Sequence, residues 1–558
     1  MEVPDGAVAG QGEQGGGDEA TAGLLGSAPG SECDAPATCR PALKVWRNEG
    51  WRGYTRLCID RISLLWPAYL GSSMEFYELV TYLHSGAALK ANFLGDDYSS
   101  TWSSLGVWVG HGCTFLVRPL GGLLFGWMGD RYGRSTSMII AMIGMSATTT
   151  LVGCIPSSSW GFWALLLLKV LQGLFVSGES PAAVVYSIEQ SHPETACVTG
   201  TSLFVSAVYC GILFASLLSF AVMSSMPEQQ YLAWGWRLPF LAALPMGVAV
   251  VHLRRRLPET EAFQRAQQQG QTQAQHHSGS HQKENGPQPG GGPGCLEKGL
   301  PWQHIPGTKA SQLPWLSVLL GMACISANPA AAYGGLLYFP AFLSSTASLY
   351  SVRAASSLSV TGTLAGIVAS PVCGVLGDLY GPELMIMLGS LLVALLSWPL
   401  WLLTVSSLRL AYAASVLWAW MIAFQGGTYA TFLADMFPTS CRASGIGISV
   451  NVTFAIFGGL WPLLETVMWE AMDAANSSRG EGGSLVPRWL IDSCPALLLA
   501  AVGVLGLLGS TVLTRMRAAG RLQCHLMQSL CEGAEDRRVH GEELSCEMPT
   551  LDGEQPRL

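Results

Sequence analysis

The octapeptide Gly126-Trp-Met-Gly-Asp-Arg-Tyr-Gly133 returns later in the chain as Gly374-Val-Leu-Gly-Asp-Leu-Tyr-Gly381. Five of the eight positions are identical, and each copy directly follows a long apolar stretch. A short motif that recurs at equivalent places indicates that the chain is built from two related halves.

The composition indicates that these halves lie in a membrane. Of the 558 residues, 49% are hydrophobic and only 12% are charged, whereas a soluble chain carries about 25% charged residues. The mean hydropathy is +0.34. Since lipid offers no water to unpaired backbone groups, apolar stretches of about 20 residues are expected to be helices. Twelve such segments lie near 61–86, 103–126, 136–155, 160–187, 198–224, 237–256, 314–343, 354–377, 383–404, 408–433, 443–469 and 488–514.

The expected fold is an all-α membrane protein with twelve transmembrane helices in two six-helix bundles. The bundles are expected at 57–258 and 314–515, joined by a disordered linker at 259–313 that is rich in Gln, Gly, His and Pro. Disordered tails are expected at 1–56, which is rich in Gly, Ala and acid, and at 516–558.

Lysine and arginine in the loops predict the orientation, because such residues gather on the cytosolic side. With the first residue inside, the cytosolic side collects Arg40, Lys44, Arg47, Arg52, Arg56, Arg131, Arg134, Arg254, Arg255, Arg256, Lys298, Lys309, Arg442, Arg515, Arg517 and Arg521. The other side keeps Lys90, Arg353, Arg409, Arg479 and Arg488. Both termini and the linker are therefore expected to be cytosolic. The plasma membrane is favoured over an organelle membrane.

The first copy of the repeat resembles the signature loop of the major facilitator superfamily. The matching residues are Gly126, Gly129, Asp130, Arg131, Gly133 and Arg134. Glycines permit a close helix approach, and Asp130 can sit at the N-terminal end of a neighbouring helix, where the dipole favours an anion. The resemblance implies a loop that latches the cytosolic side shut in the outward-facing state. The second copy keeps Gly377 and Asp378 but lacks the arginines.

Further motifs narrow the resemblance to the metabolite:proton symporter family, which includes proline/betaine, α-ketoglutarate, citrate and shikimate transporters. They are Phe115-Leu-Val-Arg-Pro-Leu-Gly-Gly122, Leu171-Gln-Gly-Leu-Phe-Val-Ser-Gly-Glu179, Trp234-Gly-Trp-Arg-Leu-Pro-Phe240, Leu257-Pro-Glu-Thr-Glu-Ala-Phe263 and Met436-Phe-Pro-Thr439. The resemblance implies a secondary active transporter that moves an organic acid, an amino acid or a betaine-like zwitterion by alternating access and proton symport.

Ionisable residues inside spans are costly and therefore mark functional sites. Glu75 and Glu78 flank Tyr77 in the first span, and their spacing of three residues puts the two acids on one helical face. The family often has Asn-Ala-x-Glu-Trp-Phe-Asp there, so Glu75 matches its Glu, Glu78 replaces its Asp, and Ser72 replaces its Asn. Two nearby buried carboxylates cannot both ionise freely, which suits a proton carrier.

Other polar residues within the spans are expected to bind solute or couple protons: His111, Arg118, Lys169, Gln172, Glu179, Asn328, Tyr333 and Asn451. Arg118 could hold a substrate carboxylate or pair with an acid of the first span. Arg118, Lys169 and Glu179 could equally form structural ion pairs, and His111 could be an interior packing residue.

The sequence suggests no catalytic set, metal site or cofactor, so an enzyme is not expected. The expected partners are a small-molecule substrate, protons and the lipid bilayer, and no basic face suits nucleic acid. Protein partners are left open. A non-transporting nutrient receptor on the same fold and a proton-independent uniporter remain the alternatives.

Overall fold

The computed structural model describes residues 50–93, 100–158, 160–265, 267–268, 315–339, 343, 349–461, 464–465, 467–468, 471–472, 493–519, 521–522 and 525–526. All of them belong to one compact unit, 40–558.

The first half consists of long helices joined by short turns. Its elements are α2 (Gly50–His84), α3 (Gly86–Phe93), α4 (Ser100–Tyr132), α5 (Arg134–Cys154), α6 (Gly161–Glu189), η1 (Pro193–Thr195), η2 (Ala196–Ser202), α7 (Leu203–Ser225), α8 (Glu228–Gln230), η3 (Tyr231–Gly235) and α9 (Arg237–Arg254).

The second half repeats this plan. Its elements are α11 (Trp315–Ile325), α12 (Ala327–Pro329), η5 (Ala330–Tyr338), α14 (Val352–Tyr380), α15 (Pro382–Ser406), α16 (Leu408–Gly426), α17 (Tyr429–Ala434), η6 (Thr439–Cys441), α18 (Arg442–Phe454), η7 (Ala455–Gly459) and α21 (Cys494–Ala518).

Ten helical stretches in the described part are long and apolar enough to cross a membrane. The expected twelve are completed by α2 and α4, which are 35 and 33 residues long and contain several ionisable residues. The described residues contain no β-strand. The predicted all-helical membrane fold is therefore confirmed.

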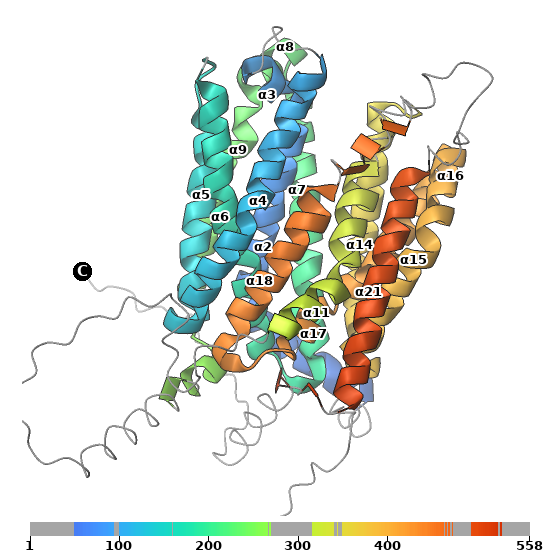
Figure 1. Cartoon of the computed structure of the whole chain (residues 1–558). Helices are drawn as coiled ribbons and strands as arrows, with labels where there is room; N and C mark the ends of the chain where they lie inside the picture. Colours follow the sequence, from blue (N-terminus) through green and yellow to red (C-terminus); the bar gives the residue numbers. More distant parts are fainter. Residues whose placement is uncertain are drawn as a thin grey trace, which may run out of the picture. The chain divides into compact units, whose positions relative to one another are not determined.

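The two halves meet along two helix pairs (Figure 1). In the first half α5 packs against α6 and α9, and in the second α15 packs against α16 and α21, while α4 contacts α18 and α7 contacts α14 across the halves. The first of these contacts needs glycine, since a Cβ on Gly122 would lie 2.7 Å from the carbonyl oxygen of Gly447. Backbone thus meets backbone where the halves close.

Two expected boundaries differ from the structure. Helix α2 already begins at Gly50, inside the segment expected as a tail, and 259–265, expected as the start of the linker, is ordered around a buried Thr260. The remainder of the expected linker and most of both tails lie outside the described residues. The ordered segment extends beyond the expected boundary because Thr260 and its neighbours form hydrogen bonds with residues at the helix ends.

Three of the arginines that were expected in cytosolic loops are buried. The side chains of Arg134, Arg254 and Arg442 are 1%, 0% and 0% exposed. Each pairs with a carboxylate inside the protein, so these residues serve packing between helices and do not report the sidedness of a loop.

Candidate functional site

A central cavity lies between the two halves. It is lined by α2, α4, α6 and α7 of the first half, and by α12, η5, α16, α17 and α18 of the second. Contributions from both halves put the cavity where a relative movement of the halves would change access to it.

One ion pair lies in the cavity wall. Nη2 of Arg118 is 3.1 Å from Oε1 of Glu75, and the two side chains are only 5% and 3% exposed. Ser180 donates a hydrogen bond to the other oxygen of Glu75. Nε of Arg118 has no hydrogen-bond partner among the described residues. Glu75 and Arg118 are the only charged side chains that the described lining contains.

Aromatic rings from the second half face this ion pair. The ring centroid of Tyr333 lies 5.4 Å from that of Phe115 and 6.1 Å from that of Phe454. Tyr429 lies 6.5 Å from Phe454. Phe115 in turn lies 4.3 Å below the guanidinium carbon of Arg118. The hydroxyl of Tyr333 has no hydrogen-bond partner within the described part of the chain, which leaves it available to a bound solute.

Glu78 belongs to a separate buried cluster. Gln172 donates from Nε2 to Oε2 of Glu78 and to the hydroxyl of Thr149, both at 2.7 Å. Lys169 donates to the amide oxygen of Gln172, and its ammonium lies 4.2 Å from the ring centroid of Tyr82. The two acids of α2 therefore have different cations, Arg118 directly and Lys169 through an amide.

Two of the residues proposed from the sequence are held by structural contacts outside the cavity lining. Glu179 receives two hydrogen bonds from Arg254, 2.7 and 2.5 Å long, between fully buried side chains. Arg254 also donates to the carbonyl oxygen of Ala68 at 2.8 Å, and the hydroxyl of Tyr77 donates to that of Pro239. Glu179 is thus the anion of a helix-packing pair, an alternative that the sequence left open.

The remaining predicted residues are divided between the lining and its surroundings. Asn328 and Asn451 line the cavity, but the amide nitrogen of Asn451 is bound by the carbonyl oxygens of Ser177 and Gly447 at 2.9 and 2.8 Å. His111 is buried and is not part of the lining, and its ring lies 4.8 Å from that of Phe115.

Asp130 lies at the N-terminal end of α18, in the position that the motif predicts. Its carboxylate accepts hydrogen bonds from the backbone N–H groups of Ala443 and Ser444 at 3.1 and 2.9 Å, and from the hydroxyl of Ser444 at 2.6 Å. Free N–H groups at a helix start favour an anion. We call this contact between the halves the first latch.

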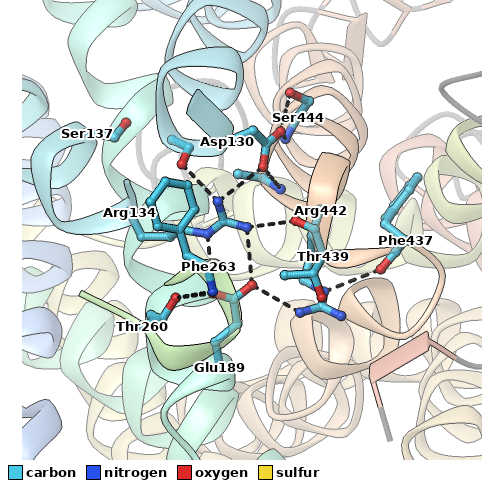
Figure 2. A network of polar contacts seen from close by, with 12 residues as sticks. Asp130, Arg134, Ser137, Glu189, Thr260, Phe263, Phe437, Thr439, Arg442 and Ser444 are labelled. Carbon is cyan, nitrogen blue, oxygen red and sulfur yellow. Dashed lines mark hydrogen bonds and ion pairs between the residues drawn. The ribbon is translucent and has the colours of Figure 1, made fainter. Parts of the chain in front are cut away.

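A buried charge cluster supports the first latch (Figure 2). Glu189, at the end of α6, lies 3.2 Å from Arg134 and 3.0 Å from Arg442, and all three side chains are almost completely buried. Arg134 also lies 3.5 Å from Asp130 and donates to the carbonyl oxygen of Thr439 at 2.9 Å. Arg134 and Glu189 come from the first half and Arg442 from the second, so the cluster ties the halves together.

The segment after α9 closes this cluster from outside. Thr260 donates to Oε2 of Glu189 at 2.7 Å, and the ring of Phe263 lies 5.0 Å from the guanidinium carbon of Arg134. Glu259 accepts the backbone N–H groups of Arg134 and Ser135 at 3.0 and 3.2 Å. Gly133, with φ +103°, leaves room for it, because a Cβ there would lie 2.2 Å from Glu259.

Other residues of the motif allow the close approach. A Cβ on Gly126 would lie 2.7 Å from the Cα of Ser444, and one on Gly129 would touch Ala443 at 3.4 Å. Arg131 is exposed and lies over the rings of Trp127 and Tyr132, so it takes no part in the cluster.

The second copy of the motif forms a second latch. Asp378 accepts the backbone N–H groups of Cys197 and Val198, at the start of η2, at 2.7 and 3.1 Å, and the hydroxyl of Tyr54 at 2.8 Å. A Cβ on Gly377 would lie 3.2 Å from the side chain of Cys197. Both latches lie at the end of the bundles where α6 is followed by η1 and η2, which we call the latch face.

Two repeated helical halves around a shared cavity, closed against each other at one face, define a membrane transporter that works by alternating access. The chain belongs to the major facilitator superfamily, since the family model for the Major Facilitator Superfamily matches residues 67–462. It is a secondary active transporter of a small organic solute.

Characterised relatives and solved structures agree with this assignment. The proline/betaine transporter of Escherichia coli (strain K12) is 30% identical over 81% of this chain and 83% of its own length. The ectoine/proline transporter ProP of Corynebacterium glutamicum is 28% identical over 73% and 80%. The proton:xylose symporter XylE has the same fold, with a TM-score of 0.65 at 14% identity over 84% of this chain and 98% of XylE.

Glu189, Arg254 and Arg442 are absent from the site predicted from the sequence. Glu189 lies at the end of a long apolar stretch, and the two arginines flank apolar spans, where loop cations are also found. No local signal therefore marks these three residues as buried. Their burial depends on contacts between distant segments, such as the pair between Glu189 and Arg442, which are 253 residues apart.

Proposed function

We propose that the chain transports a small zwitterion of the proline or betaine type and couples its movement to protons. The observation that carries this proposal is the Glu75–Arg118 pair, which provides one cation and one anion in a cavity otherwise lined by apolar, aromatic and uncharged polar groups.

Arg118 is suited to hold the carboxylate of the solute. A guanidinium binds carboxylates through paired N–H donors, and Nε of Arg118 is free of hydrogen bonds within the described chain. The aromatic rings of Tyr333, Tyr429 and Phe454 offer cation–π faces to an ammonium group. This combination matches the two poles of an amino acid or a betaine.

A dicarboxylate or tricarboxylate fits the cavity less well. Each further carboxylate would need its own cation or several hydrogen-bond donors once water is excluded. Arg118 is the one cation that the described lining provides, and Glu75 beside it would repel a second anion. We therefore favour zwitterions over citrate-like and ketoglutarate-like solutes.

The same geometry links protons to solute. A solute carboxylate at Arg118 competes with Glu75 for one guanidinium, and two carboxylates beside one cation in a low-dielectric site favour protonation of one of them. Protonation of Glu75 would release Arg118 to the solute, so proton and solute would bind cooperatively. Glu78, with Lys169 behind Gln172, is the second acid available for this linkage.

We further propose that the latch face is cytosolic and that the chain acts in the plasma membrane. Four exposed arginines lie at this end of α2 and α9: Arg52, Arg56, Arg255 and Arg256. Basic residues gather on the cytosolic side of membrane proteins, which supports this orientation. Asn476-Ser-Ser478, a glycosylation sequon that precedes α21 in the sequence, lies outside the described residues and would be extracellular.

Uptake into liposomes that contain the purified chain tests the proposal. With an acidic outside and a neutral inside, radiolabelled proline, glycine betaine or ectoine should accumulate above the outside concentration, and a protonophore should abolish the accumulation. Protein-free liposomes are the control. Accumulation of citrate or α-ketoglutarate without any zwitterion would refute the solute assignment. Equilibration of a zwitterion without accumulation would refute proton coupling, and binding without uptake would indicate a receptor.

A further inference from the structure

A groove runs along the outer surface of the first half, where α5 and α9 lie side by side. Its walls include Ile143 and Ala147 of α5 and Leu244 and Val248 of α9, and one end is formed by His252 and Arg255. We call it the α5–α9 groove. No residue lines both this groove and the central cavity, so solute transport does not account for it.

The groove is built by one small residue between larger neighbours. The two helices touch at Gly247, where a Cβ would lie 2.0 Å from the hydroxyl oxygen of Ser146. Beside this contact, Ile143, Leu244 and Val248 stand 48%, 49% and 62% exposed. The helices touch at the floor of the groove, and apolar side chains protrude at its rims. An open channel is left between them, on a surface that faces lipid in a membrane protein.

The dimensions of the groove suit one acyl chain. Leu244 and Arg255 are eleven residues apart, which corresponds to about 16 Å along a helix axis. Half of the hydrocarbon core of a bilayer is about 15 Å thick. Since Arg255 follows α9 at the latch face, the groove spans the hydrocarbon depth of the leaflet on that side.

The end at the latch face is positively charged. Arg255 and Arg256 are both exposed, and neither forms an ion pair with any described residue. Nη2 of Arg256 lies 3.2 Å from Nε2 of His252, and since a guanidinium can only donate, this contact turns the guanidinium toward the groove's end. An apolar channel that ends in two cations matches an acyl chain that ends in a phosphate.

We propose that the α5–α9 groove binds an anionic phospholipid of the leaflet at the latch face. An acyl chain occupies the groove from Leu244 to Val251, and the phosphodiester contacts Arg255 and Arg256. Because Arg254, the neighbour of Arg255, is paired with Glu179 in the core of the first half, the bound lipid stabilises this end of α9.

Native mass spectrometry of the full chain in detergent tests the proposal, with phosphatidylglycerol and phosphatidylcholine as probes. The chain should retain phosphatidylglycerol preferentially. The double substitution Arg255→Gln and Arg256→Gln should weaken that retention about 25-fold, since each basic residue near a lipid headgroup contributes about fivefold. Arg515→Gln, which removes an exposed arginine from the last turn of α21 in the second half, should leave it unchanged. Equal retention of both lipids, or full retention by the double variant, would overturn the proposal.

A second variant separates the groove from a diffuse charge effect. Ala147 is exposed within the groove, so Ala147→Phe fills the channel without touching the arginines. It should weaken retention of phosphatidylglycerol at least fivefold while the elution volume of the protein stays the same. Unchanged retention by a variant that elutes like the parent chain would show that the groove is not the site.

Discussion

The two latches use the same backbone geometry but differ in their side-chain support. In each copy of the motif a glycine with positive φ, +103° at Gly133 and +94° at Gly381, ends the turn. In each, an aspartate accepts two N–H groups at the start of a helix in the other half. The first latch adds the cluster of Arg134, Glu189 and Arg442, whereas the second adds the hydroxyl of Tyr54.

This difference indicates that the first latch contributes more than the second to the stability of the closed latch face. Pro382 stands where the first copy has Arg134, so the second latch holds no equivalent cation. Charge-assisted hydrogen bonds contribute roughly twice as much as neutral ones. In the cavity, too, the charged groups come from the first half, which supplies the ion pair. The aromatic lining is shared, with Phe76, Phe204 and Tyr209 from the first half and Tyr333, Tyr429 and Phe454 from the second.

The largest effect is expected at the anion that two buried arginines share. Glu189→Gln leaves Arg134 and Arg442 without their carboxylate, and an uncompensated buried charge costs about 3–5 kcal/mol. Thermal unfolding in detergent should show the loss as a strongly lowered midpoint. Glu383→Gln, at a partly exposed ion pair with Arg517 in the second half, is the matched control and should cost less than about 1 kcal/mol. Equal losses in the two variants would show that the buried carboxylate shared by two arginines adds no special stability to the first latch.

Asp130→Asn is expected to reduce transport next most strongly. The variant loses a charged partner for the start of α18 and for Arg134, and hydrogen bonds to charged groups contribute about 1.5–3 kcal/mol. Initial uptake should fall by at least about tenfold, with the amount of protein in the membrane nearly unchanged. Normal uptake by this variant would contradict the role of the first latch.

Asp378→Asn should have a smaller effect, because no cation among the described residues pairs with Asp378 and would lose its anion. Asparagine keeps an acceptor oxygen for the N–H groups of Cys197 and Val198, so uptake should fall only about threefold in the same assay, which corresponds to about 0.7 kcal/mol. A loss as large as that of Asp130→Asn would mean that backbone capping, common to both latches, sets the stability of closure, and that the charge cluster does not.

Tyr54→Phe should have the smallest effect of the series. It removes one hydrogen bond to Asp378 and leaves both backbone N–H groups in place. Uptake is expected to stay within about twofold of the parent chain, which corresponds to less than about 0.5 kcal/mol. A larger loss than that of Asp378→Asn would show that Tyr54 acts independently of the aspartate.

Local patterns in the sequence predicted much of this architecture. The length of the apolar stretches predicted the helices, and the repeated motif predicted the two halves. The position of Asp130 followed from the preference of helix starts for anions. The spacing of Glu75 and Glu78 put both acids on one helical face, because three residues along a helix return to nearly the same face, and both side chains are buried in the structure.

The remaining features depend on contacts that no local pattern records. Glu75 and Glu78 share a helical face, yet Glu75 lines the cavity with Arg118 while Glu78 lies in the cluster with Gln172. Arg254 and Glu179 meet only once α9 has packed against α5 and α2. In a sequence, a buried arginine at the end of a span looks like a loop arginine, and only its distant carboxylate distinguishes the two.

Proton-driven uptake by Glu75→Gln tests the central claim most directly. Glutamine keeps the shape of Glu75 but removes its titration, and it leaves Arg118 free for the carboxylate of the solute. In vesicles with an imposed proton gradient, the variant should no longer concentrate a zwitterion, whereas counterflow exchange of that zwitterion should persist. If Glu75→Gln still concentrates the solute against its gradient when the proton gradient is applied, Glu75 is not the coupling carboxylate and the account of the cavity is wrong.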